Sequence, residues 1–437
     1  MTARQAAVIC LLEVENGGYS NLSLDRILSS NKVRGGDGDF LSALFYLTLE
    51  RQITLDYIID KYLLNPGKKL DIEVRVILRT GLCQILYMNG VPDFAAVDES
   101  VKLCSHMKIK SAGTLVNAVL RKALAYGSET LADKINETGM YSIIYSVNEP
   151  LCRLLNMQYG SRVQDILKGF FTRGKQALRV NTLKTDARSV LERFQKDGIS
   201  AETGPLEASV YIKDGKPQTS AVFKEGLIRP QSICSQTAVA ALAPREGDRV
   251  IDMCCAPGGK SLTAAQLMKN KGEIIAIDRH ANRLKLVDER AKAEGISIIK
   301  TINADSSVPD TGLLNSADRV IVDVPCSGFG EIYSKPELRH KLPASDNGLP
   351  EIQHRILTNA ADYLKVKGRL VYSTCTLDKR ENHEVVKRFL DSSKEYIPVS
   401  DMVFQGFEPD ENGFLTHLPS EADGEGFFIA AFEKAER

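Results

Sequence analysis

Two cysteines in the C-terminal half directly follow apolar segments that have the character of buried strands. Cys326 lies in VPCSGFG after the segment RVIVD, and Cys375 ends the segment GRLVYSTC. A thiol at the end of a strand is held at a crevice, where it can act as a nucleophile or in proton transfer. The other scattered cysteines are expected to be inert, buried apolar groups: Cys10, Cys83, Cys104, Cys152 and Cys234.

The stretch MCCAPGGKS, residues 253–261, nearly spells a phosphate-binding loop. Its last three residues match the end of the pattern G-x-x-x-x-G-K-[ST], and Asp323 after RVIV resembles a magnesium-holding position. Cys254, however, stands where the first glycine should be, which removes conformational freedom that a phosphate loop uses. Asp278 lies 19 residues after Gly259 and suits a ribose. The pattern therefore favours an adenosine-bearing ligand without a triphosphate.

An adenosine-type cofactor and a thiolate are needed together when a cytosine is methylated at C5. That carbon is a poor nucleophile until a thiolate adds at C6 and makes C5 enamine-like. The adduct must then lose its C5 proton and expel the thiolate, a step that a second cysteine can assist. Asp323 can protonate or hydrogen-bond N3 of the attacked ring.

These residues have to be positioned by a mainly parallel α/β sheet. From about residue 235 the chain alternates apolar strands with helical stretches, which is typical of such a sheet. Ligands bind at the carboxyl ends of parallel strands. Five strand ends converge there, and they carry residues 254–260, Asp278, Asp305, residues 323–328 and Cys375.

The rest of the chain predicts two further parts. Residues 1–140 are helical by periodicity, and in VRVILRTGLCQILYM the arginines Arg75 and Arg79 fall on the face opposite the apolar one. These arginines are either solvated or part of an RNA-binding module. Residues 145–230 predict a small α+β domain, and residues 231–437 the α/β domain.

The composition is that of an ordinary globular protein. The chain has 437 residues, 43% of them hydrophobic and 26% charged, with a formal charge of zero, so RNA binding would need a local basic face. No run of eighteen apolar residues and no signal peptide is present, which indicates a cytoplasmic protein without a membrane span. Disulfides are not expected, because the nine cysteines are odd in number and scattered over a chain with no secretion signal. A metal site is not expected either, because no cysteine or histidine cluster has zinc spacing.

Several motifs resemble those of the bacterial 16S ribosomal RNA cytosine-C5 methyltransferases of the RsmB (Sun/Fmu) type. CCAPGGKS resembles their cofactor loop CAAPGGKT, DVPCSGFG their DAPCSGxG, and LVYSTCTLDKRENHEVV their catalytic strand and the helix after it. LRVNTLK, EGLIRPQSICSQ and two helical segments extend the resemblance over essentially the whole chain. It implies a NusB-like helical domain, a small α+β linker domain that also grips RNA, and a Rossmann-like methyltransferase domain of the NOL1/NOP2/Sun type.

The resemblance also implies residue roles. Cys375 would be the nucleophile at C6, Cys326 would assist product release, and Asp323 would act on the ring. The enzyme would be a monomer that methylates C5 of cytosine 967 in 16S ribosomal RNA. The residues that would bind S-adenosylmethionine or line its pocket are Cys254, Cys255, Ala256, Pro257, Gly258, Gly259, Lys260, Asp278, Arg283, Asp305 and Asp323.

Some positions depart from the family pattern. Where the family commonly has GVxRRxPD, this chain has GEIYSKPE, so Tyr333 and Ser334 replace a basic pair and Glu331 adds a negative charge. Ser232 stands where the family usually has Asp. Phe329 either stacks on a flipped base or packs, and Glu381 and Asn382 are expected to cap or orient a helix rather than to take part in the chemistry.

Two other functions fit part of these features. A non-catalytic RNA-binding protein of the same fold would have no reason to keep both Cys326 and Cys375. A methyltransferase of transfer RNA or of other ribosomal RNA would share the same catalytic half. The helical N-terminal domain favours 16S ribosomal RNA, because that domain is the family's distinguishing addition.

Overall fold

The computed structural model divides into two compact units. Unit 1 contains Met1–Phe171 and Ser334–Pro343, and unit 2 contains Thr172–Tyr333 and Ala344–Arg437. The structure describes the chain except for residues 31–32, 34–36, 64–68, 127–132, 134, 173, 344–347, 400–401, 403, 405–408, 422–423 and 437.

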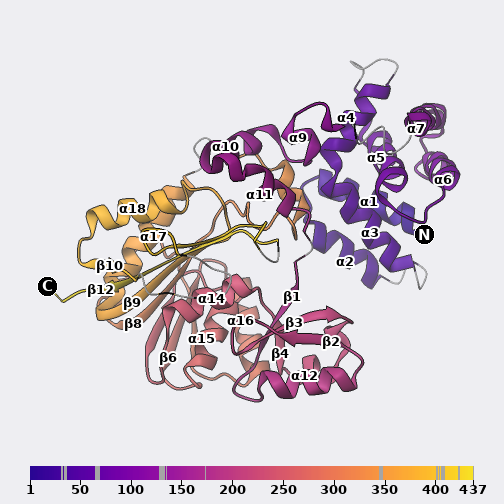
Figure 1. Ribbon diagram of the computed structural model, residues 1–437. Helices are drawn as coiled ribbons and strands as arrows, with labels where there is room; N and C mark the ends of the chain where they lie inside the picture. The colour runs from indigo at the N-terminus through magenta and orange to yellow at the C-terminus, as the bar shows by residue number, and fades with distance from the viewer. Residues whose placement is uncertain are drawn as a thin grey trace. The chain divides into compact units, whose positions relative to one another are not determined.

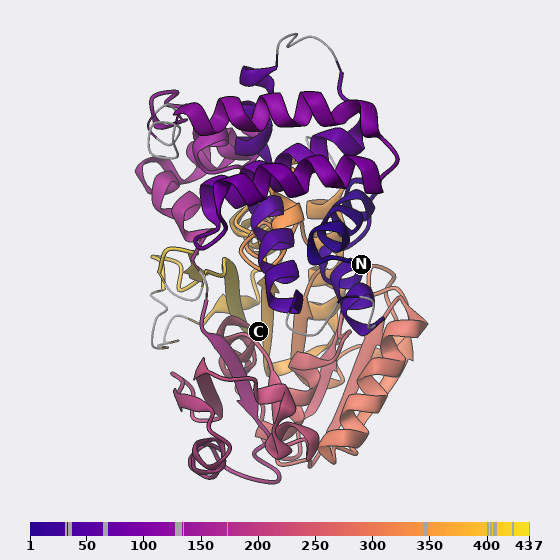
Figure 2. The same cartoon turned by 90° about the vertical axis from the view of Figure 1, so that its right-hand side faces the viewer.

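Unit 1 is built from helices that stack side by side (Figure 2, indigo to violet). The first is capped by Thr2, whose side chain accepts a hydrogen bond from the Gln5 N–H, while the Gln5 side-chain oxygen accepts one from the Thr2 N–H. The described helices are α1 Ala3–Glu15, α2 Ser20–Ser29, α3 Asp37–Glu50, α4 Gln52–Tyr62, α5 Ile72–Tyr87, α6 Asp93–His106, α7 Gly113–Tyr126, α9 Tyr141–Ile144, α10 Glu149–Tyr159 and α11 Val163–Gly169, with 3-10 turns η1 Lys110–Ala112, η2 Gly160–Arg162 and η5 Pro336–His340.

Helix α5 confirms the predicted apolar face but corrects the face opposite to it. Arg79 was expected on a solvated or RNA-facing surface, yet it is only 5% exposed. Its guanidinium lies 2.7 Å from Asp56 and 2.5 Å from Glu15. Since acidic residues of α4 and α1 neutralise it, Arg79 ties three helices together and is not a contact for RNA.

The small α+β part of unit 2 is an antiparallel sheet in the order β2-β3-β1-β4. Helix α12 starts at Asp186, which accepts the Ser189 N–H at 2.8 Å, and packs Val190 and Phe194 on the sheet. The elements are β1 Gln176–Val180, α12 Ala187–Lys196, β2 Ser200–Thr203, β3 Ser209–Asp214, η3 Pro217–Thr219, α13 Ala221–Lys224 and β4 Ile228–Pro230.

The remainder of unit 2 is the predicted α/β sheet, with strands in the order β10-β12-β9-β8-β5-β6-β7 and β11 paired to β12. Strands β7, β6, β5, β8 and β9 run parallel to one another, whereas β12 pairs antiparallel with β9, β10 and β11. The elements are α14 Ile233–Leu242, β5 Arg249–Asp252, α15 Gly259–Leu267, β6 Glu273–Asp278, α16 Ala281–Glu294, β7 Ile299–Asn303, η4 Thr311–Leu313, β8 Ala317–Asp323, α17 Leu349–Tyr363, β9 Leu364–Thr374, α18 His383–Ser392, β10 Tyr396–Pro398, β11 Leu415–His417 and β12 Phe427–Lys434.

Successive strand residues face opposite helical layers, as the period of two in a strand requires. In β8, Val320 and Val322 belong to the core with α17 and α18, whereas Ile321 belongs to the core with α14 and α15. Figure 1 shows α17 and α18 on one face of the sheet and α14, α15 and α16 on the other. The fold class predicted from the sequence is confirmed.

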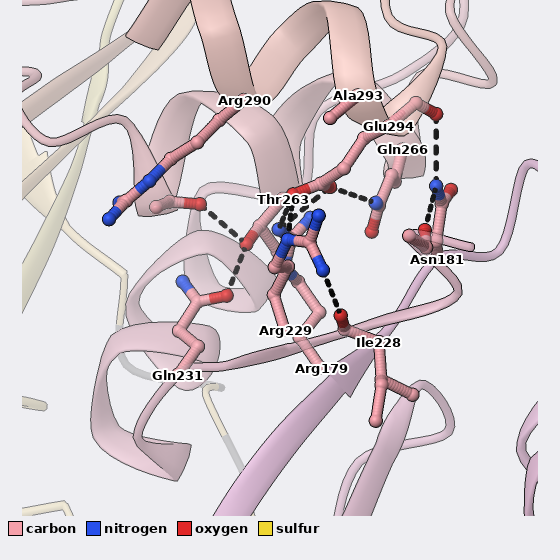
Figure 3. A network of polar contacts seen from close by, with 12 residues as sticks. Arg179, Asn181, Ile228, Arg229, Gln231, Thr263, Gln266, Arg290, Ala293 and Glu294 are labelled. Atoms are coloured by element: carbon pink, nitrogen blue, oxygen red, sulfur yellow. Dashed lines mark hydrogen bonds and ion pairs between the residues drawn. The ribbon is translucent and has the colours of Figure 1, made fainter. Parts of the chain in front are cut away.

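A buried polar network joins the small sheet to the large one (Figure 3). The Arg179 guanidinium in β1 lies 2.9 Å from the Glu294 carboxylate at the end of α16, and their side chains are 3% and 1% exposed. Gln266 also donates to Glu294 at 2.9 Å, and Asn181 donates to the Glu294 carbonyl at 2.9 Å. The predicted boundaries at 140–145 and 230–231 stay a prediction.

None of the described helices is both long and apolar enough to cross a membrane.

Candidate active site

The loop after β5 is held on both sides by backbone hydrogen bonds. The Cys255 N–H donates to the Ile277 carbonyl of β6 at 2.9 Å, and the Gly258 N–H closes a turn onto Cys255 at 2.7 Å. Gly258 has φ +98°, and a Cβ there would lie 3.1 Å from Val287 of α16. Only glycine combines that backbone conformation with so close a helix, which explains the tight turn in CAPGGK.

Asp278 at the end of β6 fastens this loop. Its carboxylate accepts the Ala256 N–H at 3.3 Å and the His280 N–H at 2.8 Å. Arg283 lies 3.5 Å from the same carboxylate and donates to the Ala256 carbonyl at 2.5 Å. The structure thus brings Asp278 and Arg283 to the loop, as expected of them, and Arg290 adds a bond to the Pro257 carbonyl at 2.9 Å.

Four carboxylates act on Cys254. Burial raises the pKa of Cys254 well above its usual value, and the negative charges of Asp252, Asp323, Asp278 and Asp305 raise it further. Asp305 itself is exposed, and the hydroxyl and N–H of Ser307 lower its pKa by donating to the carboxylate. A loop surrounded by this much negative charge suits a cationic ligand.

Asp252 is a residue of the site that the sequence reasoning missed. It ends β5, is fully buried, and accepts the Ser261 hydroxyl at 2.6 Å. Burial raises its pKa to about 7, and the charge of Asp323 also raises it, while the Ser261 hydroxyl and Lys260 lower it. Its place, directly after an apolar strand and before the loop, was the available signal.

Lys260 and Asp323 form an ion pair inside the site. The Lys260 Nζ lies 2.7 Å from the Asp323 carboxylate, and the Ser373 hydroxyl of β9 donates to the other Asp323 oxygen at 2.7 Å. Burial lowers the pKa of Lys260, but the charge and hydrogen bond of Asp323 outweigh it and raise the pKa overall. The lysine of the apparent phosphate motif therefore serves a carboxylate.

The two candidate thiols meet at the ends of adjacent parallel strands. Cys326 follows β8, Cys375 follows β9, and their sulfur atoms are 3.2 Å apart. The pKa of Cys375 is raised well above its usual value by its hydrogen bond with Cys326, by burial and by the nearby charges of Glu331 and Asp323. Both thiols are partly exposed, whereas the five cysteines expected to be inert are buried.

The residues flanking Cys375 are fixed by Asn382. Its amide oxygen accepts the Thr374 hydroxyl at 2.5 Å, and its amide nitrogen donates to the Thr376 carbonyl at 2.9 Å. Asn382 is the N-cap residue of α18, but its side chain makes no cap hydrogen bond to that helix. Asn382 instead positions the segment that carries Cys375.

The loop that carries Cys326 has a matching support. Glu381 accepts the Ser327 N–H at 2.9 Å and the Gln353 amide at 2.8 Å, and Gln353 also donates to the Pro325 carbonyl at 2.9 Å. Phe329 is 1% exposed, so of its two predicted roles the packing one holds.

Two departures from the expected pattern now have a structural reading. Ser232 starts α14 and accepts the Ser235 N–H at 3.2 Å, a capping role that serine and aspartate share. Glu331 approaches the Cys375 sulfur, which donates to its carboxylate at 3.3 Å. The sequence indicated only that Glu331 adds a charge nearby.

The residues present fit S-adenosylmethionine. Its sulfonium and ammonium groups are cationic, and the loop is surrounded by aspartates. Two buried polar atoms beside the loop have no hydrogen-bond partner among the residues that the structure describes, the Asp252 Oδ1 and the Gln231 amide nitrogen. This Gln231 nitrogen lies 3.5 Å from where a Cβ on Gly259 would stand. In the part of the chain that is described, no group of three or more His, Cys, Asp or Glu could hold a metal ion.

Comparison with known families covers most of the chain. A model of the family "16S rRNA methyltransferase RsmB/F" matches residues 239–433. A model of the NusB family matches residues 1–125, and a model of the RsmF/B-like ferredoxin-like domain matches residues 150–217. These matches agree with the predicted NusB-like, small α+β and methyltransferase parts.

Individual proteins are similar over the full length. The probable ribosomal RNA small subunit methyltransferase B of Bacillus subtilis is 33% identical over 99% of both chains. The protein of the same name from Synechocystis is 31% identical over 100% of both. The crystal structure of PH0851 is 26% identical, with a TM-score of 0.82 over 99% of this chain and 98% of that one.

Proposed function

The chain belongs to the RsmB/F family of S-adenosylmethionine-dependent ribosomal RNA small subunit methyltransferases, and from this premise we propose that it forms 5-methylcytosine in 16S ribosomal RNA through a covalent bond between Cys375 and C6 of the base. The proposed target is the residue equivalent to cytosine 967. The observation that carries the proposal is the 3.2 Å approach of two thiols from adjacent strand ends. A single thiol would suffice for addition, but regeneration of the base needs a second proton acceptor nearby.

Each group has a defined task. As the Cys375 sulfur bonds to C6, the C5=C6 electrons shift toward N3, where Asp323 offers a proton or hydrogen bond that Lys260 can resupply from 2.7 Å. When bound, S-adenosylmethionine supplies an electrophilic methyl group for C5. Cys326 then takes the C5 proton, the S–C6 bond breaks and the C5=C6 double bond returns.

The remaining assignments complete the proposal. The cofactor is bound by residues 254–260 with Asp278, Arg283, Asp305 and Asp323, and Asp278 takes the ribose hydroxyls. The NusB-like part (1–140) and the small α+β part (145–230) grip the RNA, and residues 231–437 catalyse. The enzyme works as a monomer in the cytoplasm, where ribosomal RNA is found.

The nucleophile is tested by replacing Cys375. With labelled S-adenosylmethionine and unmodified 16S RNA, Cys375→Ala is expected to reduce methyl transfer by at least about 10³-fold, because the adduct cannot form. Cys104→Ala, a buried thiol of unit 1, is the matched control and should keep its rate. Full methyl transfer by Cys375→Ala would rule out the covalent mechanism. Label found only in transfer RNA would move the enzyme to that substrate class.

The release step is tested by replacing Cys326. Cys326→Ala should still add to C6 and accept the methyl group, but it should release product slowly. A protein–RNA band that survives denaturing electrophoresis is then expected. The double variant Cys326→Ala/Cys375→Ala should show none, and absence of the band from the single variant would remove the release role.

A further inference from the structure

Glu331 is held rigidly against the end of the strand that carries Cys375. The Gly330 N–H donates to the Cys375 carbonyl at 2.9 Å, and the Gly426 N–H donates to the Gly330 carbonyl at 2.8 Å. A Cβ at position 330 would stand only 1.8 Å from the Gly426 oxygen, so three backbone segments are in direct contact here. The residue after Gly330 therefore has little freedom to move away from Cys375.

The carboxylate of Glu331 is positioned to receive a proton from the thiol. The Cys375 sulfur donates to Glu331 Oε2 at 3.3 Å. Among the described residues, further charged or titratable groups that act on the pair include Cys326 and Asp323, which act on Cys375, and Glu425, which acts on Glu331. The charge of Lys260 also acts on Cys375, and Lys260 pairs with Asp323.

Glu425 is a further carboxylate that interacts with Glu331. It is 7% exposed, and burial raises its pKa to about 7, with the charge of Glu331 raising it and the Ser232 hydroxyl lowering it. The negative charge of Glu331 thus disfavours the ionised form of Glu425. Ser232, which stands where the family pattern has an acidic residue, avoids a further carboxylate at this point.

On the premise of the proposed function, we propose that Glu331 is a further catalytic residue, the base that takes the Cys375 proton as the sulfur bonds to C6. The S–H bond breaks, an O–H bond forms on Glu331, the sulfur electron pair forms the S–C6 bond, and the C5=C6 electrons move toward N3. When the S–C6 bond breaks after methyl transfer, the leaving thiolate recovers the proton from Glu331. No oxidant or further reactant is needed.

This role makes a two-sided prediction, because Glu331 affects the thiol in two opposite ways. As a neighbouring negative charge it disfavours the free thiolate, and as a base it favours attack on C6. Removing only its charge should make the resting thiol more reactive toward a small reagent. The same change should make methyl transfer slower.

The experiment compares both rates in Glu331→Gln and in the wild type. Single-turnover methyl transfer to 16S RNA should fall by about 10²-fold, and its rate should rise tenfold per pH unit, since hydroxide must now remove the proton. Alkylation of Cys375 by iodoacetamide, followed by peptide mass analysis, should accelerate at least about threefold, because loss of the Glu331 charge lowers the pKa of the thiol. Glu331→Asp should recover part of the transfer rate, and Glu384→Gln on the exposed face of α18 should change neither rate.

Each of the other outcomes would contradict the proposal that Glu331 takes the Cys375 proton. If both rates rise, Glu331 is only a repulsive neighbour, and if transfer is unchanged, it has no part in the step. If both rates fall alike in Glu331→Gln and Glu331→Asp, the residue is structural. Failure of the proposed function is distinct, because wild type and Glu384→Gln would then also transfer no methyl group to cytosine.

Discussion

Asn382 bonds to the residues on both sides of Cys375, so the thiol depends on an amide that never meets the substrate. Asn382→Ala removes the bonds to Thr374 and Thr376 and should let the segment drift. A misplacement near 1 Å can cost about 10²-fold in rate. We expect that loss in single-turnover methyl transfer with unchanged binding of S-adenosylmethionine by equilibrium dialysis. A parallel loss of cofactor affinity would show that Asn382 supports the loop of residues 254–260 instead.

Asp252 makes stability depend on pH. Its pKa rises from an ordinary 3.8 to about 7 on folding, so between these values the folded state holds a proton that the unfolded state has lost. Its contribution is therefore greatest at low pH and declines as pH rises from about 4 to 7. Asp252→Asn keeps an acceptor for Ser261 and does not titrate. The melting temperature of the wild type minus that of Asp252→Asn should fall across this range and then level off; a flat difference would contradict the shift.

At the residue scale, the sequence predicted the positions of those candidate groups that lie at or just after the end of a parallel strand. Cys326, Cys375, Asp278 and Asp323 were placed by the rule that parallel strands end at one edge. The contacts of Glu331 and Asn382 were not predicted. They depend on how loops fold back over the strand ends, and local periodicity holds no information on that.

Among the elements, the small sheet is attached to α16 through a charge pair with almost no access to water. Arg179→Met would leave the buried Glu294 with Arg229, at 3.9 Å, as its remaining ion-pair partner and should destabilise unit 2 by about 3 kcal/mol. The double variant Arg179→Met/Glu294→Leu should recover much of that loss, because no charge remains buried. Urea denaturation of the two variants gives the comparison. Equal destabilisation of single and double variants would show that the bonds matter and the charge does not.

The same scale shows which elements could be anticipated. The five parallel strands were predicted because each lies in an apolar segment that alternates with a helical one. Strands β2, β4 and β10 were missed because they are short and lie in no such apolar run, and their pairing is set by neighbouring strands. Arg79 was misassigned for a related reason: periodicity gives the apolar face of α5 but not the acidic partners that cover the other face.

At the scale of the whole molecule, composition and motifs did not predict to which unit the segment Ser334–Pro343 belongs. It follows the Cys326 loop in sequence but belongs to unit 1, where Arg339 is fully buried. Its guanidinium donates to the Phe170 carbonyl at 2.7 Å and to the Tyr145 carbonyl at 2.9 Å. It also lies 4.2 Å from the Phe171 ring centre.

Arg339→Ala should therefore destabilise unit 1 by about 3 kcal/mol, in the range of other large-to-small changes in a core. Arg339→Lys should restore little of the lost stability, because an ammonium group lacks the planar fork that donates to two carbonyls and stacks on a ring. Scanning calorimetry should show the transition of unit 1 moving to lower temperature. If Arg339→Lys melts as the wild type does, only the charge matters.

Because unit 1 is formed by two separate parts of the chain, it cannot be completed in the order in which the chain is synthesised. The helices of unit 1 leave the ribosome first, yet the unit lacks Arg339 and its neighbours until residue 343 has been synthesised. The N-terminal part of unit 1 therefore stays incomplete until residues 334–343 have been synthesised. A gene fragment that stops after residue 171 would accordingly lack the contacts of Arg339 with Tyr145, Phe170 and Phe171. A peptide spanning residues 334–343 would supply them.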